Sequence, residues 1–167
     1  MSKATNITAG YDFGDGVPIK VRYIFRGTPY GREELAAVKE AFRGGTLTMG
    51  PQVEAFEKEF ARYVGCKRAF AVSNCTTAMH VVTQMLDIGP GDEVIVTPNT
   101  FIATSLVIVK EGATPVYADI DPRTFNILPA AIEKKITRRT KAIYVVHYGG
   151  QSCDMDAIMR LARKHKL

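Results

Sequence analysis

The sequence lacks the long apolar run that a membrane-spanning helix requires, since no hydrophobic stretch approaches ~20 residues. Residues 1–6 lead into no apolar core, so we expect no secretory signal. Hydrophobic residues nevertheless make up 46% of the chain and charged residues 23%, which is typical of globular proteins rather than disordered ones. These features together predict a cytoplasmic protein without a membrane partner.

Cysteine is scarce. The three cysteines, Cys66, Cys75 and Cys153, are odd in number and far apart. A disulfide framework and a zinc site are therefore both disfavoured, and the pattern suits a reduced compartment. We expect no bound metal.

The chain also lacks the basic motif with interleaved aromatic residues that would indicate a nucleic-acid partner. Its formal net charge of +5 comes largely from two groups that lie on or beside expected helices. A solvated helix face explains both groups without a nucleic acid. They are Lys134, Lys135, Arg138, Arg139 and Lys141, and Arg160, Arg163, Lys164 and Lys166.

The 167 residues have room for one domain of ordinary size. Glycines interrupt residues 1–30, which we interpret as an N-terminal arm with one short strand at 18–25. Apolar residues at helical spacing then predict a helix over 32–43 and, after a connector at 46–51, a second helix with its apolar face from Val53 to Val64, and glycines follow both.

From residue 68 onward, expected strands alternate with expected helices. The strands are 68–72, 93–97, 114–118 and 142–146, and the last of them is apolar throughout, as in a strand buried on both faces. The helices are 76–87, 129–136 and a last one capped by Asp154, with Met155, Ile158, Met159 and Ala162 facing inward. Residues 102–111 are rich in β-branched residues, but parallel strands need a crossover, which favours a helix. The alternation predicts an α/β fold with a mostly parallel sheet flanked by helices.

The last expected helix is followed by no strand. We therefore expect the N-terminal part of a larger α/β protein, and we expect this piece alone to aggregate or to need a partner.

One turn has the composition of an anion site. The strand-like run 68–72 stops at Ser73, and Asn74, Cys75, Thr76 and Thr77 lead into the next helix. The first turn of a helix offers unpaired N–H groups and the positive end of the helix dipole, which suit a phosphate. The alternative is that Ser73, Asn74 and Thr76 only cap the helix, and the residues alone leave both interpretations open.

Seven segments in register resemble the DegT/DnrJ/EryC1/StrS family of pyridoxal-phosphate-dependent sugar aminotransferases. The resemblance extends from about residue 31 to residue 167. It implies part of the large domain of the type I aminotransferase fold, a homodimer, and transfer of an amino group from glutamate or a similar donor to a nucleotide-linked keto-deoxysugar, for cell-surface polysaccharide or secondary-metabolite biosynthesis. The segments are Leu47–Pro51, Ser73–Ala78, Gly89–Ile95, Thr97–Phe101, Asp119–Pro122, Thr140–Ile143 and Val146–Gln151.

The resemblance also implies roles for particular residues. Cys75 and Thr76 fall on the positions that hold the phosphate of pyridoxal 5'-phosphate, although glycine or alanine is usual where Cys75 stands. Phe101 falls on the aromatic residue that stacks on the cofactor ring; the alternative is a core residue that opens a helix. Gln151 is expected near the cofactor's 3-oxygen or the substrate. His147 is expected as a substrate neighbour or a structural histidine, and Asn99 and Tyr148 are further candidate neighbours.

No catalytic residue is expected within the chain. The family's aspartate that pairs with the pyridine nitrogen and its Schiff-base lysine would both lie after Leu167, and Lys67, Lys110 and Lys141 look solvated. The 167 residues alone should therefore be inactive. Two alternatives remain open: a sugar 3-dehydratase of the same family, which has histidine in place of the lysine, and a non-catalytic α/β fragment that recognises phosphate.

Overall fold

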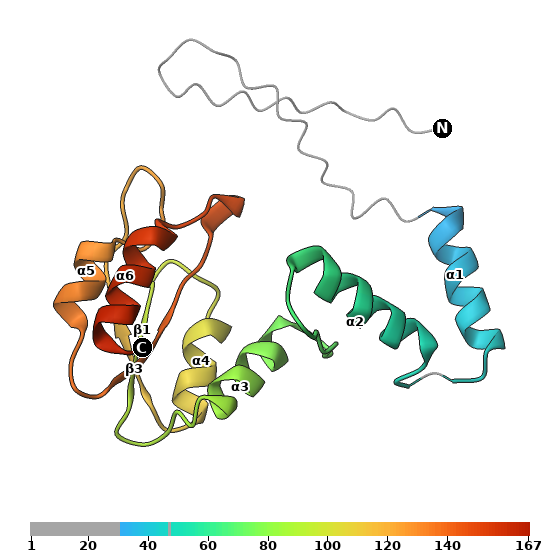
Figure 1. The fold of residues 1–167 in the computed structure, drawn as a ribbon, viewed down its shortest axis with the longest axis horizontal. Helices are drawn as coiled ribbons and strands as arrows, with labels where there is room; N and C mark the ends of the chain where they lie inside the picture. The colour runs from blue at the N-terminus through green and yellow to red at the C-terminus, as the bar shows by residue number, and fades with distance from the viewer. Residues whose placement is uncertain (1–30, 47) are drawn as a thin grey trace, which may run out of the picture. The chain divides into compact units, whose positions relative to one another are not determined.

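The computed structural model describes residues 31–46 and 48–167 (Figure 1). The chain divides into two compact units, one that ends at Phe70 and one that comprises Ala71–Leu167. The strand predicted at residues 18–25 lies outside the described residues. None of the helices in the described ranges is long and apolar enough to cross a membrane.

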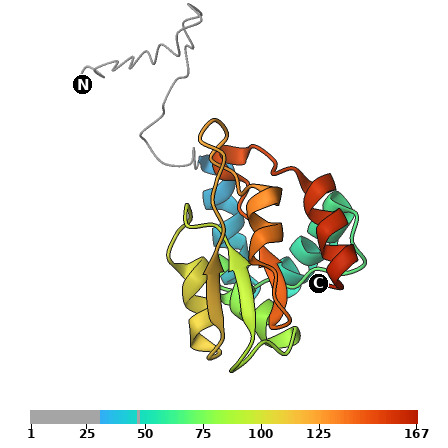
Figure 2. The ribbon, with the colours of Figure 1, turned by 90° about the vertical axis from the view of Figure 1, so that its left-hand side faces the viewer.

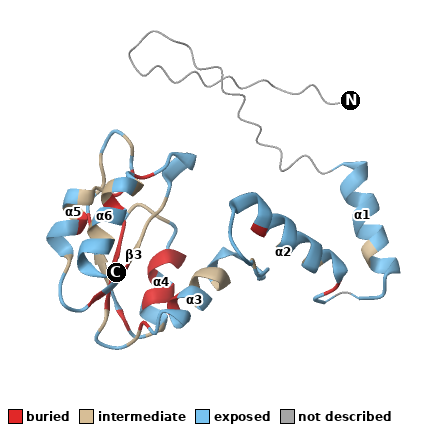
Figure 3. Cartoon of the chain, in the orientation of Figure 1, coloured by how far each residue is buried: buried red, intermediate tan, exposed pale blue. Residues whose placement is uncertain are grey.

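The first unit contains helices α1 (Arg32–Arg43) and α2 (Pro51–Val64), as the sequence predicts. The Glu34 carboxylate accepts a hydrogen bond from the Gly31 amide at 2.5 Å, which satisfies one free donor at the start of α1. Proline at the first position of α2 needs no amide partner, and Gly65 ends that helix with a left-handed φ of 73°. Figure 3 shows both helices mostly exposed, and Ala61 is their one buried residue.

The second unit is an α/β layer structure with a parallel sheet. Its strands are β1 (Glu93–Val96), β2 (Thr114–Tyr117) and β3 (Thr140–Tyr144), in the order β2-β1-β3. Its helices are α3 (Cys75–Met85), α4 (Ala103–Lys110), α5 (Pro129–Lys135) and α6 (Met155–His165), with a short 3₁₀ turn at Tyr148–Gly150. The helix expected over 102–111 is confirmed, because it is the crossover between the parallel strands β1 and β2.

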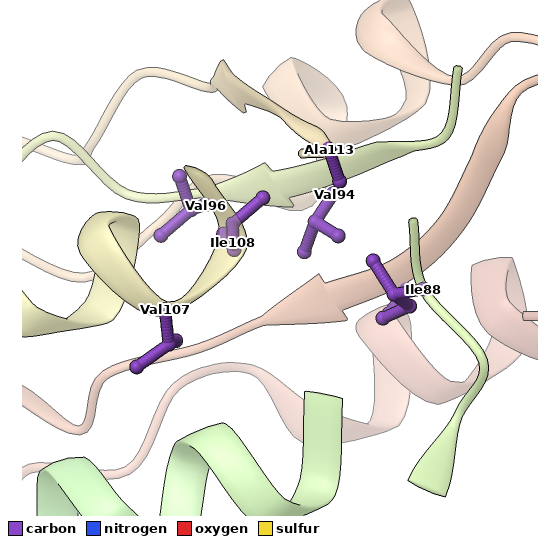
Figure 4. Packing of buried hydrophobic residues seen from close by; sticks show 7 residues of the cluster. Ile88, Val94, Val96, Val107, Ile108 and Ala113 are labelled. Carbon is purple, nitrogen blue, oxygen red and sulfur yellow. The ribbon is translucent and has the colours of Figure 1, made fainter. Parts of the chain in front are cut away.

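The central strand β1 supplies both faces of the core. Its side chains alternate, so Val94 and Val96 pack on the side of α3 and α4, while Ile95 packs on the side of α5 and α6 (Figures 1 and 2). Figure 4 shows Val94 and Val96 near Val107 and Ile108 of α4. Each fully buried aliphatic side chain contributes about 1.5–3 kcal/mol, so β1 is the strand on which the unit depends most.

Two strand predictions need correction. Residues 68–72 form no strand, because an extended segment needs a partner strand for its ladder hydrogen bonds, and none of the three described strands pairs with it. The strand predicted at 142–146 begins and ends two residues earlier, at Thr140 and Tyr144. It is an edge strand of the described sheet with Lys141 exposed, and the strand buried on both faces is β1 instead.

The last helix was predicted with one wrong inward residue. Asp154 caps α6 as expected, since its Oδ1 accepts a hydrogen bond from the Ala157 amide at 3.0 Å. Ile158 is buried, but Met159 is 41% exposed and Leu161 packs against the core in its place. The helix is therefore rotated slightly from the face that the apolar spacing suggested.

Candidate functional site

Three loops of the second unit leave the sheet at the same edge. The parallel pairing places Val96 beside Tyr117 and Tyr144, so the segments after β1, β2 and β3 all begin at the carboxyl ends of the strands. Ligands of open α/β sheets bind at this edge. Phe101 lies in the first of these loops, and His147 and Gln151 lie in the third.

The N-terminus of α3 is capped but not closed. The Asn74 side chain accepts a hydrogen bond from the Thr77 amide at 2.9 Å, and the Ser73 and Thr77 hydroxyls lie 3.1 Å apart. Among the described residues, no hydrogen bond reaches the amides of Cys75 and Thr76 or the Thr76 hydroxyl, and both residues are exposed. Capping and anion binding are therefore compatible here, because they use different amides of the same turn.

The loop after β1 is braced by its own hydroxyl groups. The buried Thr97 accepts a hydrogen bond from the Asn99 amide at 3.1 Å, and the Thr100 and Thr104 hydroxyls lie 2.8 Å apart. Phe101 follows directly and is 76% exposed. It belongs to neither core cluster, so the alternative of a core residue that opens a helix is wrong for the described chain.

The loop after β3 is held by Cys153. The Cys153 amide donates a hydrogen bond to His147 Nδ1 at 3.1 Å, and its thiol donates to the Val146 carbonyl at 3.2 Å. Burial raises the pKa of the Cys153 thiol, so this cysteine is a structural group rather than a nucleophile. Because Nδ1 accepts, the His147 ring is neutral in this arrangement and its Nε2 carries the proton. His147 is thus hydrogen-bonded and exposed at once.

Gln151 is exposed and is positioned by its backbone. Its amide donates to the Tyr148 carbonyl at 3.0 Å, and its carbonyl accepts a hydrogen bond from Asn126 Nδ2 at 3.1 Å. No interaction of its side chain with another described residue is found. The Gln151 side chain is therefore available to a ligand, while the backbone that carries it is fixed.

The sequence analysis missed the segment that connects the loops after β1 and β3. The Phe125 carbonyl accepts a hydrogen bond from Asn99 Nδ2 at 3.4 Å, and the Phe125 and Tyr148 rings lie 5.7 Å apart. The next residue, Asn126, is buried and bonds to the loop after β3. The sequence did contain one signal, because the polar Asn126 lies between the apolar residues Phe125 and Ile127. A turn on the surface does not require such apolar neighbours.

The structure joins some of the predicted site residues and leaves others separate. Segment 125–126 links the loop of Phe101 to the loop of His147 and Gln151. No hydrogen bond or ion pair among the described residues connects Cys75 or Thr76 to these loops. Lys67, Lys110 and Lys141 are all exposed, as predicted, and so are the basic residues of both expected solvated groups.

Comparison with known proteins gives close relatives over most of the chain. It is 53% identical over 137 residues to the spore coat polysaccharide biosynthesis protein SpsC of Bacillus subtilis (strain 168), which covers 82% of this chain and 35% of that protein. It is 46% identical over 138 residues to dTDP-3-amino-3,6-dideoxy-alpha-D-galactopyranose transaminase of Aneurinibacillus thermoaerophilus, which covers 83% and 38%. The chain thus spans about a third of the length of these relatives.

A solved structure has the same fold. The putative sugar aminotransferase Spr1654 of Streptococcus pneumoniae, in its PLP-form, superposes with a TM-score of 0.78 at 33% sequence identity, over 81% of this chain and 34% of that one. The expectation of part of an aminotransferase fold is therefore confirmed. The model of the DegT/DnrJ/EryC1/StrS aminotransferase family matches residues 29–167. The chain belongs to the DegT/DnrJ/EryC1/StrS aminotransferase family.

Proposed function

We propose that the protein containing this chain is a cytoplasmic, homodimeric aminotransferase that uses pyridoxal 5'-phosphate. Its substrate is a nucleotide-linked keto-deoxysugar, and glutamate or a similar amino acid donates the amino group. The family match and the names of the two relatives support the reaction class and the sugar substrate. The PLP-form of the solved relative supports the cofactor.

The observation that carries this proposal is the open N-terminal turn of α3. Two free amides and the Thr76 hydroxyl are exposed at the positive end of a helix of 11 residues. These donors fit a phosphate dianion, since each can form a charge-assisted hydrogen bond and the helix dipole adds favourable electrostatics. The site needs only a backbone amide at Cys75, so the side chain in place of the usual glycine or alanine does not block it.

The other predicted residues have complementary tasks in this proposal. The free face of Phe101 stacks on the pyridine ring and fixes its plane. Gln151 can donate through its carboxamide to a ring oxygen or a sugar hydroxyl, and His147 can donate through Nε2. The bound cofactor supplies an electron sink for the substrate carbon that gains or loses a proton. The chain's own residues bind and orient it, and the proton-moving lysine is assigned to sequence after Leu167.

The proposal is tested by titrating the complete protein with pyridoxal 5'-phosphate. Thr76→Val removes one hydroxyl with little change in volume and should raise the dissociation constant about tenfold, the cost of one hydrogen bond to a charged group. Thr114→Val changes a similarly exposed threonine at the opposite end of the sheet and serves as the matched control. Equal affinity in both variants would remove Thr76 from the phosphate site, and no binding by the unaltered protein would refute the proposed function.

The product of the reaction distinguishes the proposed aminotransferase from the sugar dehydratase of the same family. An aminotransferase leaves the nitrogen of the amino donor on the sugar, whereas a dehydratase removes a hydroxyl group and leaves the sugar without an added amino group. Mass spectrometry of the sugar nucleotide after incubation with glutamate distinguishes the two products. An unaminated, dehydrated sugar would replace this proposal with the dehydratase.

A further inference from the structure

Asn126 occupies an unusual position for an uncharged polar residue of a loop. It is 5% exposed, and its side chain forms hydrogen bonds with the loop after β3. Its backbone is already bonded, with its carbonyl accepting from the Asp121 amide at 2.9 Å and its amide donating to Thr124 Oγ1 at 3.4 Å. The hydrogen bonds of the Asp121–Asn126 turn therefore fix the backbone of Asn126 independently of its side-chain contacts.

The side chain of Asn126 then satisfies three backbone groups of one short loop. Its Oδ1 accepts from the Tyr148 amide at 2.9 Å, and its Nδ2 donates to the carbonyls of Gln151 and Ser152 at 3.1 and 3.2 Å. The carboxamide thus spans both ends of the 3₁₀ turn Tyr148–Gly150. Only asparagine presents an acceptor and two donors at this length, because aspartate lacks the donors and serine lacks the reach.

This arrangement matters because the Cys153 contacts stay within the loop, whereas Asn126 makes the hydrogen bonds that join residues 148–152 to another segment among the described residues. Gly149 and Gly150 both have left-handed φ angles, 61° and 85°, and the loop side chains from His147 to Gln151 are exposed. A loop with two glycines has many alternative conformations, and ordering it carries a substantial entropic cost. Buried hydrogen bonds to its backbone restrict those alternatives.

We propose that Asn126 is a positioning residue, whose carboxamide holds the Tyr148–Ser152 loop in the conformation in which Gln151 contacts the bound cofactor or its sugar substrate. The inference rests on the proposed function for the identity of the ligand. It goes beyond that function because Asn126 itself touches no ligand in this account. Its effect passes through the backbone of Gln151.

The first test combines amide exchange with cofactor titration in the complete protein. Asn126→Ala and Asn126→Asp are expected to speed hydrogen–deuterium exchange across residues 147–153 and to raise the dissociation constant of pyridoxal 5'-phosphate about tenfold, since a buried donor or acceptor loses its partner. Ile108→Ala is the control, because Ile108 is fully buried and packs in the cluster on the opposite side of the sheet from Cys153 and its loop. It should lower the unfolding midpoint and leave both loop exchange and affinity unchanged.

A double-mutant cycle separates positioning from general stability. If Asn126 acts through Gln151, then Asn126→Ala should weaken binding less in a Gln151→Ala background than in the unaltered protein. Additive losses of affinity, unchanged loop exchange, or an equal loss of affinity in Ile108→Ala would each overturn the inference. If the unaltered protein still binds the cofactor, the proposed function remains intact in each case. Absence of cofactor binding in the unaltered protein would overturn both.

Discussion

The hydroxyl of Tyr144 at the end of β3 lies 2.6 Å from Oγ1 of Thr83 in the last turn of α3. Thr83 donates its own proton to the Met79 carbonyl at 2.7 Å, so the tyrosine is the donor in this pair. Thr83 is fully buried. The contact therefore fixes α3, the helix with the proposed phosphate site, to the edge of the sheet from which the loop of Gln151 leaves.

Tyr144→Phe removes this hydrogen bond and keeps the ring. We expect it to lower the free energy of unfolding by about 1 kcal/mol, measured by urea denaturation. Tyr117→Phe is the control, since the Tyr117 hydroxyl bonds to Ser105 at 3.1 Å but its side chain is more exposed. Equal losses in the two variants would mean that the Thr83–Tyr144 pair has no special role.

Glu93 makes the stability of the second unit depend on pH. Its carboxylate accepts hydrogen bonds from the Thr137 hydroxyl at 2.5 Å and from the Arg139 guanidinium, and these contacts hold the pKa of Glu93 below its ordinary value. A lowered folded-state pKa stabilises the fold above the ordinary glutamate pKa, and this stabilisation is lost as the pH falls through the lowered value.

The expected result is an unfolding midpoint in urea that falls for the unaltered protein as the pH approaches and passes below the ordinary glutamate range. Glu93→Gln should be less stable at neutral pH, and its unfolding midpoint should fall less steeply as the pH is lowered into the acid range. Glu133→Gln is the comparison, because the Lys164 hydrogen bond also lowers the pKa of Glu133 but the pair is exposed and screened by solvent. If the unfolding midpoint of Glu93→Gln fell as steeply with acidification as that of the unaltered protein, Glu93 would not be the source of the pH dependence.

The inward side of α4 should be far more sensitive than its outward side. Ile108 is 0% exposed and Leu106 is 54% exposed on the same helix. Ile108→Ala is expected to cost about 2–5 kcal/mol by leaving a cavity, and Leu106→Ala less than about 1 kcal/mol. Thermal denaturation compares the two variants directly, and a larger loss for Leu106→Ala would mean that α4 packs through its other face.

Phe101 should affect the cofactor rather than the fold. Removal of a stacking ring costs about 0.5–1.5 kcal/mol, so Phe101→Ala should raise the dissociation constant of pyridoxal 5'-phosphate about two- to tenfold, and Phe101→Tyr should retain affinity. Ile102→Ala changes the neighbouring exposed residue and controls for changes in the loop. Fluorescence titration gives all three values, and an unchanged affinity in Phe101→Ala would remove the stacking role.

Local patterns in the sequence were sufficient for most of the second unit. Apolar spacing, caps and turn residues predicted α3, α4, α5 and α6, and the need for a crossover resolved residues 102–111. The strand predictions that were wrong concern segments whose structure depends on partners distant in the chain. Residues 68–72 have the composition of a strand but no partner strand among the described residues, and the start of β3 is set by pairing with β1, since the Glu93 amide donates to the Arg139 carbonyl.

For the candidate site too, features formed by neighbouring residues could be predicted, and features that depend on distant residues could not. The open first turn of α3 follows from residues that are adjacent in sequence, so its donors could be anticipated. Asn126 could not, because its three partners lie 22 to 26 residues away in sequence. Only the folded loop brings them around its carboxamide.

The most direct measurement is a crystal structure of the complete protein with pyridoxal 5'-phosphate bound. This account predicts phosphate oxygens within about 3 Å of the amide nitrogens of Cys75 and Thr76 and of the Thr76 hydroxyl. A phosphate bound elsewhere, with these three donors facing only water, would contradict it.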